Sequence, residues 1–302
     1  MSKSNEYGFI GASPTQSSSS NTGVFEVNDV VELLDDSKWP LQVFDVSYLI
    51  VAGGGGAGTG NDAPGGGGAG GLRNSFGSES SGGGGSTETP LQNIGADGST
   101  TYTVTVGAGG STNNKGSNSV FHTFTSEGGG QGGASNNQSG GTGGSGGSGG
   151  GGGHASGGAG AGTSNQGFAG IAGNTSDASN HQGGGGGGAG ATGGYGGNAA
   201  GVTSSITGSA VTYAQGGERA TKFGNSSSNS GAGDVVAANT GGGGNAGGGG
   251  NTSRPGGSGV VILRYPSNVS ITAGSGLTSS TATDGLFKVT TFTAGTDTIV
   301  FT

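Results

Sequence analysis

The sequence predicts a mainly β protein in which polyglycine tracts, extended like polyproline II helices, form a bundle beside short strands, with almost no α-helix. Three observations lead to this prediction. Glycine accounts for 82 of the 302 residues, about four times its ordinary share. Short apolar or alternating segments recur between the glycine tracts, as expected of β-strands. From Gly140 to His154, the non-glycine residues are separated from one another by multiples of three, and three residues per turn is the repeat of the polyproline II helix.

The glycine tracts need a source of stability other than side-chain burial. Only 27% of the residues are hydrophobic, and glycine loses more backbone freedom on folding than any other residue. A polyproline II strand makes no internal hydrogen bonds, so its N–H and C=O groups are free to bond to neighbouring strands. A flexible Gly/Ser linker is the alternative that composition alone allows. The tracts lie at residues 53–71, 82–85, 128–133, 140–154, 183–197 and 241–250.

Two strongly apolar runs of about five residues, within 48–52 and 260–265, have the character of central strands buried on both faces. We expect them to pair with each other and to close the long insertion between them. Residues 101–106 alternate, with Tyr102, Val104 and Val106 on one face. Further strands are predicted at residues 119–125 and 209–214.

The two ends of the chain differ from the glycine-rich middle. Residues 27–34 are the one candidate for a short helix, with Asn28 as its cap. At the other end, we expect residues 286–293 and 298–301 to form a β-hairpin around a turn at 294–297, with a further strand near 269–272. The predicted organisation is an N-terminal segment (1–45) that docks to a partner or edges the next domain, a glycine-rich domain (46–266) and a C-terminal β-hairpin module (267–302).

No motif for catalysis, a cofactor or a metal emerges from the sequence. Gly53, Gly55 and Gly58 match the G-x-G-x-x-G dinucleotide fingerprint, but no helix former follows to present its N-terminus to a pyrophosphate. The three histidines, His122, His154 and His181, lie in unrelated contexts without metal-ligand spacing, and no serine stands in a nucleophile elbow. We therefore expect a protein that is not an enzyme and has no catalytic residue, cofactor or metal ion.

Charge and hydropathy exclude further classes. The net charge is −8 without a basic patch, which argues against nucleic-acid binding. The absence of cysteine removes disulfides and thiolate metal sites. The first residues lack an apolar signal region, and the longest apolar run is too short to span a bilayer. We expect synthesis in a cytoplasm, with no signal peptide and no transmembrane segment.

Binding is expected in the polar and aromatic loops that interrupt the glycine tracts. Loops on a rigid scaffold commonly carry recognition, and Tyr, Asn, Ser and Gly suit adaptable contacts. Solvated turns are an equally good interpretation of any single residue. The candidate receptor-binding residues are Asn136, Asn137, Gln138, Asn165, Gln166, Phe168, His181 and Tyr195.

Five segments share a recognisable pattern: residues 7–14, 23–25, 48–52, 102–110 and 256–266. Together they resemble the glycine-rich tail-fibre and virion structural proteins of marine and cyanobacterial phages. The resemblance covers about residues 7–30 and 46–302. The chain is also similar to the distal tail-fibre adhesins of T-even-like phages, which use glycine-helix bundles with variable loops to bind host receptors. Its N-terminal segment and its C-terminal β-hairpin depart from those adhesins.

The resemblance implies a non-enzymatic tail-fibre or tail-tip adhesin, located in the virion and made in the host cytoplasm. Its partners would be other virion proteins and a host surface glycan or outer-membrane protein. A homotrimer or another homo-oligomer is expected, because fibres are commonly trimeric and the hydrophobic core of a single chain is thin. Two alternatives remain: a purely structural fibre, decoration or self-assembling filament without a receptor, and an ice-binding protein, which the scarcity of regular Thr or Ala rows disfavours.

Overall fold

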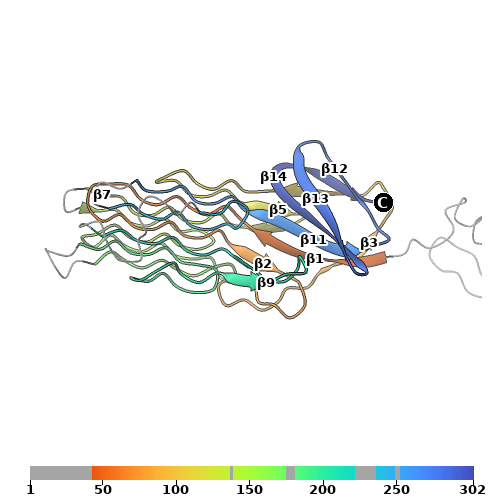
Figure 1. Cartoon of the computed structure of the whole chain (residues 1–302), viewed down its shortest axis with the longest axis horizontal. Coiled ribbons are helices and arrows are strands. Elements are labelled where there is room, and N and C mark those ends of the chain that lie inside the picture. Colours follow the sequence, from red (N-terminus) through yellow and green to blue (C-terminus); the bar gives the residue numbers. More distant parts are fainter. Residues whose placement is uncertain (1–42, 137–138, 175–180, 222–235, 249–251) are drawn as a thin grey trace, which may run out of the picture.

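The protein is elongated, with a β-sheet region at one end and long, roughly parallel glycine-rich segments at the other (Figure 1). The computed structural model describes residues 43–136, 139–174, 181–221, 236–248 and 252–302. The helix predicted at 27–34 lies outside these residues. No described segment forms a helix with the length and hydrophobicity needed to cross a bilayer.

Ten strands form one antiparallel sheet in the described part of the chain, with the order β2-β1-β11-β14-β4-β5-β6 and with β3, β12 and β13 attached to β1 or β14. Two small pairs, β9–β10 and β7–β8, stand apart. The strand bounds are β1 Val43–Val51, β2 Leu72–Asn74, β3 Leu91–Gly95, β4 Thr101–Thr105, β5 Ser119–Phe121, β6 Phe124–Ser126, β7 Ser135–Asn136, β8 Ser139–Gly140, β9 Val202–Ser204, β10 Val211–Tyr213, β11 Val260–Pro266, β12 Ile271–Ala273, β13 Leu277–Asp284 and β14 Phe287–Phe301.

The predicted pairing of the two apolar runs is confirmed. β1 and β11 pair antiparallel, with Leu49 opposite Ile262, and both faces of the pair are buried. On one face Tyr48 and Ile50 join a core with aromatic residues of β4, β5 and β14. On the other face Leu49 and its neighbours pack against Ile206 and the β9–β10 pair. Period-two alternation thus serves two separate cores.

The large sheet curls until it nearly closes around the first core. Phe301, at the end of β14, lies edge-on to Phe44 of β1 with ring centroids 5.4 Å apart. On the other side, two buried hydroxyls bridge β5 and β6 to the backbone of β1. Ser119 donates to the Val51 carbonyl and Ser126 to the Ile50 carbonyl, both at 2.8 Å. Hydrogen bonds from these two hydroxyls, rather than backbone N–H bonds, therefore join β5 and β6 to β1.

The predicted C-terminal hairpin is wrong in its pairing. Residues 287–301 form the single strand β14, whose first part pairs with β11 and β13 and whose second part pairs with β4 and β12. The residues expected to form the turn instead lie within the strand, at a shift in its register with β13. Gly295 has a φ of 99° there. The real hairpin joins β13 to β14 at Gly285, with a φ of 60°. Its Asp284-Gly285 pair is a strong turn signal.

The segment 119–125, predicted as one strand, is also a hairpin. β5 and β6 pair antiparallel, and His122 occupies the turn between them with a φ of 55°. The prediction for 101–106 holds, since Tyr102 and Val104 of β4 are buried. The predicted strand at 209–214 is present as β10.

The glycine tracts bond to one another through their backbones with a repeat of three. In the tract at 65–71, N–H groups of Gly65, Gly68 and Gly71 donate to residues 133, 130 and 127. Those of Gly66 and Ala69 donate to residues 184 and 187, and those of Gly67 and Gly70 to residues 244 and 241. Successive residues therefore address three different neighbours in turn. We call this set of mutually bonded tracts the tract array.

Residues 82–85 do not share this arrangement. Gly83 and Gly84 have φ values of 64° and 77°, far from the value near −75° of an extended polyproline-type strand. They form part of the loop between β2 and β3. The three-residue repeat of hydrogen bonds, rather than glycine content alone, therefore distinguishes the tract array.

Close approach explains why the array needs glycine. A Cβ built on Gly67 would overlap the carbonyl oxygen of Gly55 and come within 2.9 Å of the Gly244 nitrogen. Both neighbours are backbone atoms held by hydrogen bonds, so neither can move without breaking the array. The whole tract from Ala63 to Gly71 is buried. Its interior is thus made of peptide groups rather than side chains.

We expect Gly67→Ala to lower the free energy of unfolding by about 3 kcal/mol, because it combines overpacking with the loss of backbone hydrogen bonds. The matched control is Gly196→Ala. A Cβ there meets nothing within 4 Å, so the control should be neutral or slightly stabilising. Urea unfolding followed by circular dichroism measures both. Equal effects of the two substitutions would contradict the close-packed array.

A second expectation concerns Glu79, which joins the β2–β3 loop to β9. Burial opposes its ionisation, but hydrogen bonds from the Ser204 hydroxyl and from the Ser205 hydroxyl and N–H outweigh burial and lower the pKa of Glu79 from its usual 4.5. A lowered folded-state pKa stabilises the fold above about pH 4.5, and this contribution is lost as the pH falls through the folded-state value.

Glu79→Gln should therefore lower Tm at pH 7, and the difference from the wild type should shrink as the pH falls below about 4.5. Thermal unfolding of both proteins between pH 3 and pH 7 measures this. A difference that stayed constant across the range would mean that the charge of Glu79 does not contribute.

Candidate functional site

The structure divides the predicted receptor-binding residues between two places. Asn136, His181 and Tyr195 lie toward the end of the tract array that is remote from the large sheet, near β7 (Figure 1). Asn165 and Gln166 line a cleft where the array meets the sheet. Asn137 and Gln138 lie outside the described residues. The predicted residues therefore do not form one surface.

Gln166 and Phe168 have structural roles near the sheet. The Gln166 carbonyl accepts from the Leu72 N–H, and its side-chain oxygen accepts from the Glu127 N–H at 2.8 Å. The N–H of Phe168 donates to the carbonyl of Gly188. Asn165 is exposed and has a φ of 59°. These contacts hold the loop against the sheet.

The cleft beside this loop has a volume of about 900 Å³. Its lining includes Tyr48, Arg73, Glu88 and Phe124. The Phe124 ring stacks on Tyr48 at 4.8 Å, and the Arg73 guanidinium lies 5.3 Å from the centre of the Phe124 ring. The size falls in the range of small-molecule sites.

The polar groups of the cleft are engaged with one another. The Tyr48 hydroxyl donates to Glu88 Oε2 at 2.8 Å, and Arg73 Nε donates to the same carboxylate at 3.0 Å. Burial, together with the hydrogen bond to Glu88 and its charge, raises the pKa of Tyr48 well above the usual value of 10. The phenol stays protonated and remains a donor. Because Tyr48, Arg73 and Glu88 bond to one another, we interpret these side chains as links between β1, β2 and the β2–β3 loop rather than as ligand-binding groups.

At the remote end of the array, several turns are tied together by short contacts. Thr59 exchanges two hydrogen bonds with the side chain of Asn113, at 2.9 and 2.7 Å. The Ser135 N–H donates to the Thr59 carbonyl at 2.9 Å, and the Ser253 hydroxyl donates to the Gly58 carbonyl at 2.5 Å. Segments distant in sequence thus meet at one end, which we call the tip.

Two of the predicted residues at the tip expose side chains to solvent. Asn136 ends β7 and is exposed. Tyr195 is 44% exposed, although its hydroxyl donates to the Ala172 carbonyl at 2.9 Å. The Arg219 guanidinium lies 5.8 Å from the Tyr195 ring centre and donates to its carbonyl. The tyrosine ring is therefore held in place while one part of it faces solvent.

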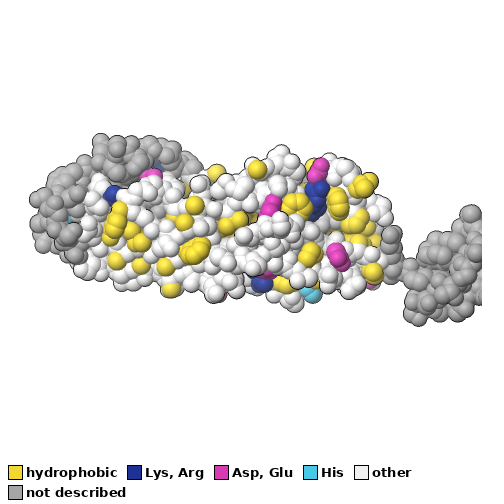
Figure 2. All heavy atoms as spheres, turned by 90° about the horizontal axis from the view of Figure 1, so that it is seen from below, with side chains coloured by type: hydrophobic (Ala, Val, Ile, Leu, Met, Phe, Trp, Pro, Cys, Tyr) yellow, Lys and Arg dark blue, Asp and Glu magenta, His cyan; other side chains and the backbone are white. Residues whose placement is uncertain are grey.

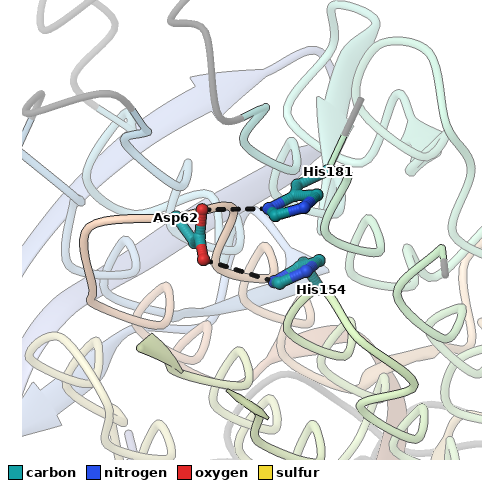
Figure 3. Close-up of side chains that lie close together, drawn as sticks. All are labelled: Asp62, His154 and His181. Carbon is teal, nitrogen blue, oxygen red and sulfur yellow. Dashed lines mark hydrogen bonds and ion pairs between the residues drawn. The ribbon is translucent and has the colours of Figure 1, made fainter. Parts of the chain in front are cut away.

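His181, the third predicted residue at the tip, is buried together with two other polar side chains. Asp62, His154 and His181 are 5%, 4% and 6% exposed. His181 Nδ1 lies 3.0 Å from Asp62 Oδ1, and His154 Nδ1 lies 3.7 Å from Asp62 Oδ2. The two imidazoles stack, with centroids 3.8 Å apart and an interplanar angle of 11°. Figure 3 shows both rings facing the carboxylate.

The tract array brings these three residues together. The tracts at 63–71, 147–154 and 183–189 bond to one another, since Gly66 donates to residue 184, Gly151 to residue 66 and Gly184 to residue 152. The final bond of one tract pair runs from the His154 N–H to the Ala63 carbonyl. Asp62 and His181 precede their tracts, whereas His154 ends its own. All three therefore reach the same end of the array.

The sequence predicts no metal site, and no local spacing in it indicates this cluster. Spacing rules look for ligands on one local element, whereas these residues are contributed by three separate tracts. In the described part of the chain, they form a group whose potential ligand atoms all lie within 4.8 Å of one another. The only signal in the sequence was that His154 ends the three-residue pattern that starts at Gly140.

We expect Glu88→Ala to destabilise the protein by about 2 kcal/mol, because the hydroxyl of buried Tyr48 loses its acceptor. In a Tyr48→Phe background that hydroxyl is absent, so the same change should cost about 1 kcal/mol less. Urea unfolding of the four proteins measures the coupling. Additive effects would show that the Tyr48–Glu88 bond does not contribute to stability.

Comparison with known proteins gives a family but no close relative. No curated protein and no solved structure matches the chain. A family model described as a glycine-rich domain matches residues 35–266, a range that contains β1, β11 and the whole tract array between them. Because the model covers more than half of the chain, this protein belongs to the glycine-rich domain family.

Proposed function

We propose that this protein is a non-enzymatic virion component, a tail-fibre or tail-tip adhesin that presents the turns at its tip to a host surface. One observation carries the proposal. The turns between tracts meet at the end of an elongated molecule, whereas the start of β1 and the C-terminus lie at the opposite end (Figure 1). A rigid scaffold that holds loops away from its chain ends suits attachment at one end and recognition at the other.

We further infer that the tracts of the array are polyglycine helices of the polyproline II type. Support comes from the three-residue repeat of their hydrogen bonds, which matches the three residues per turn of that helix. Such a bundle is a stiff spacer whose cohesion does not depend on side chains. Turns between tracts can then differ in sequence and length without changing the spacer.

The surface chemistry fits a recognition role that does not rely on charge. Figure 2 shows few Lys, Arg, Asp or Glu side chains on the face that it presents, in keeping with the 9% of charged residues. Asn136 and Tyr195 offer an amide and a partly exposed aromatic ring at the tip. Amides and aromatic rings suit a glycan or an outer-membrane protein loop, which we propose as the receptor classes.

The sheet end is the proposed site of attachment to other tail proteins or to further copies of the chain, with a trimer as the expected assembly. At the β13–β14 turn, Leu286 is 81% exposed and Phe287 is 42% exposed. Apolar side chains that project from a turn in this way suit burial against a partner.

The test measures binding of the fluorescently labelled protein to a panel of cyanobacterial and other marine bacterial strains by flow cytometry. We expect saturable binding to at least one strain. Tyr195→Ala should weaken it about 10- to 30-fold, the effect of losing an aromatic hot spot, and Asn136→Ala should weaken it less.

The control is Asn165→Gly, which keeps the left-handed backbone in the cleft loop and should bind like the wild type. Loss of binding in the control but not in the tip variants would move the receptor site to the cleft. Absence of binding to every strain would favour a purely structural fibre, and thermal hysteresis in the purified protein would favour ice binding.

A further inference from the structure

We propose that Asp62, His154 and His181 bind one divalent transition-metal ion, with zinc as the first candidate, and that the ion ties together the tip ends of three tracts. The proposal concerns a site that does not depend on receptor binding. It stands on the burial, the geometry and the placement of the three side chains.

The donor set suits such an ion. Two imidazole nitrogens and one carboxylate oxygen are common ligands of zinc and of other divalent first-row metals. Hard ions such as calcium and magnesium prefer oxygen ligands throughout. The Ser135 hydroxyl lies 3.3 Å from His154 Nδ1, so it or a water molecule can complete the coordination shell.

The distances suit it as well. Metal–ligand bonds of about 2.0–2.2 Å at tetrahedral angles place ligand atoms about 3.4 Å apart. The separations of 3.0 Å from Asp62 Oδ1 to His181 Nδ1 and 3.7 Å from Asp62 Oδ2 to His154 Nδ1 lie on either side of that value, and the candidate ligand atoms of the group all lie within 4.8 Å of one another. One adjustment is required. An ion lies near the plane of each ring that it binds, so the imidazoles must open from their stack of 3.8 Å.

Charge gives a further reason. A carboxylate that is 5% exposed is attracted strongly to an adjacent cation, because little water screens the interaction. A divalent ion at this position supplies positive charge beside the carboxylate. Neutral imidazole is also the form that binds metal.

At this position a bound ion would cross-link three tracts and so stabilise the fold. It would join residues at 62, 154 and 181, which belong to three mutually bonded tracts and are separated by long segments of chain. A cross-link between distant segments removes conformational freedom from the unfolded chain and so stabilises the fold. The expected role is to stop the tract ends from fraying at the tip.

The first experiment uses the full chain after treatment with EDTA and desalting. Isothermal titration with zinc chloride should show one ion per chain with a Kd of micromolar or below. Zinc in hundredfold excess over Kd should raise Tm by about 5 °C or more. Absence of stoichiometric binding to the folded wild-type protein would overturn the proposal.

Variants locate the site. Asp62→Asn and His181→Asn should each weaken zinc binding at least tenfold and remove the rise in Tm. The matched control is His122→Asn, which changes the histidine outside the cluster at a turn whose φ of 55° asparagine tolerates. It should bind zinc like the wild type. Equal binding by all three variants would overturn the assignment.

A measurement on the wild type keeps the test valid if a variant fails to fold. The chain has three histidines, so its imidazole protons give a simple set of NMR signals. Zinc should shift the signals of two histidines and leave the third, that of His122, unchanged. The His122→Asn spectrum assigns that third signal. A shift confined to His122 would mean surface binding only and would overturn the proposal.

Discussion

The structure depends on backbone hydrogen bonding between segments that approach too closely for side chains. In the tract at 65–71, each N–H bonds to one of three neighbouring tracts in turn. The net contribution of one such bond is only about 0.5–1.5 kcal/mol, and glycine carries a large entropy cost on ordering. The array therefore holds together only because nearly every peptide group takes part. A single Cβ at Gly67 or Gly55 would meet a neighbouring carbonyl.

This constraint explains how the remainder of the molecule is arranged. Conventional hydrophobic burial is concentrated at one end, where β1 and β11 separate two cores and the large sheet curls around the first of them. Because the array takes its cohesion from peptide groups, its turns are free to carry polar residues such as Asn136 and Asn113. Stability and surface chemistry are thus assigned to different residues, an arrangement suited to the adhesin proposed above.

The sequence predicted the parts of the fold that follow from local pattern. Apolar runs identified β1 and β11 as partners, and alternation identified β4. The errors occurred where a turn signal had to be weighed against long-range pairing. Ala294-Gly295 looked like a hairpin turn, yet partners along both halves of β14 keep it in one strand. The cluster of Asp62, His154 and His181 was beyond sequence reasoning, because tract order in space is not encoded in any local spacing.

The position of that cluster follows from the same backbone lattice. Away from the sheet, the one small apolar cluster described, Ala57, Ala220 and Ala246, adds little burial. The bond from the His154 N–H to the Ala63 carbonyl is the last of its tract pair among the described residues, and side-chain contacts add a connection between the segments there. Buried polar side chains that reach across three tract ends supply that connection. The large sheet at one end and the Asp–His–His cluster at the other therefore enclose an array with little side-chain packing of its own.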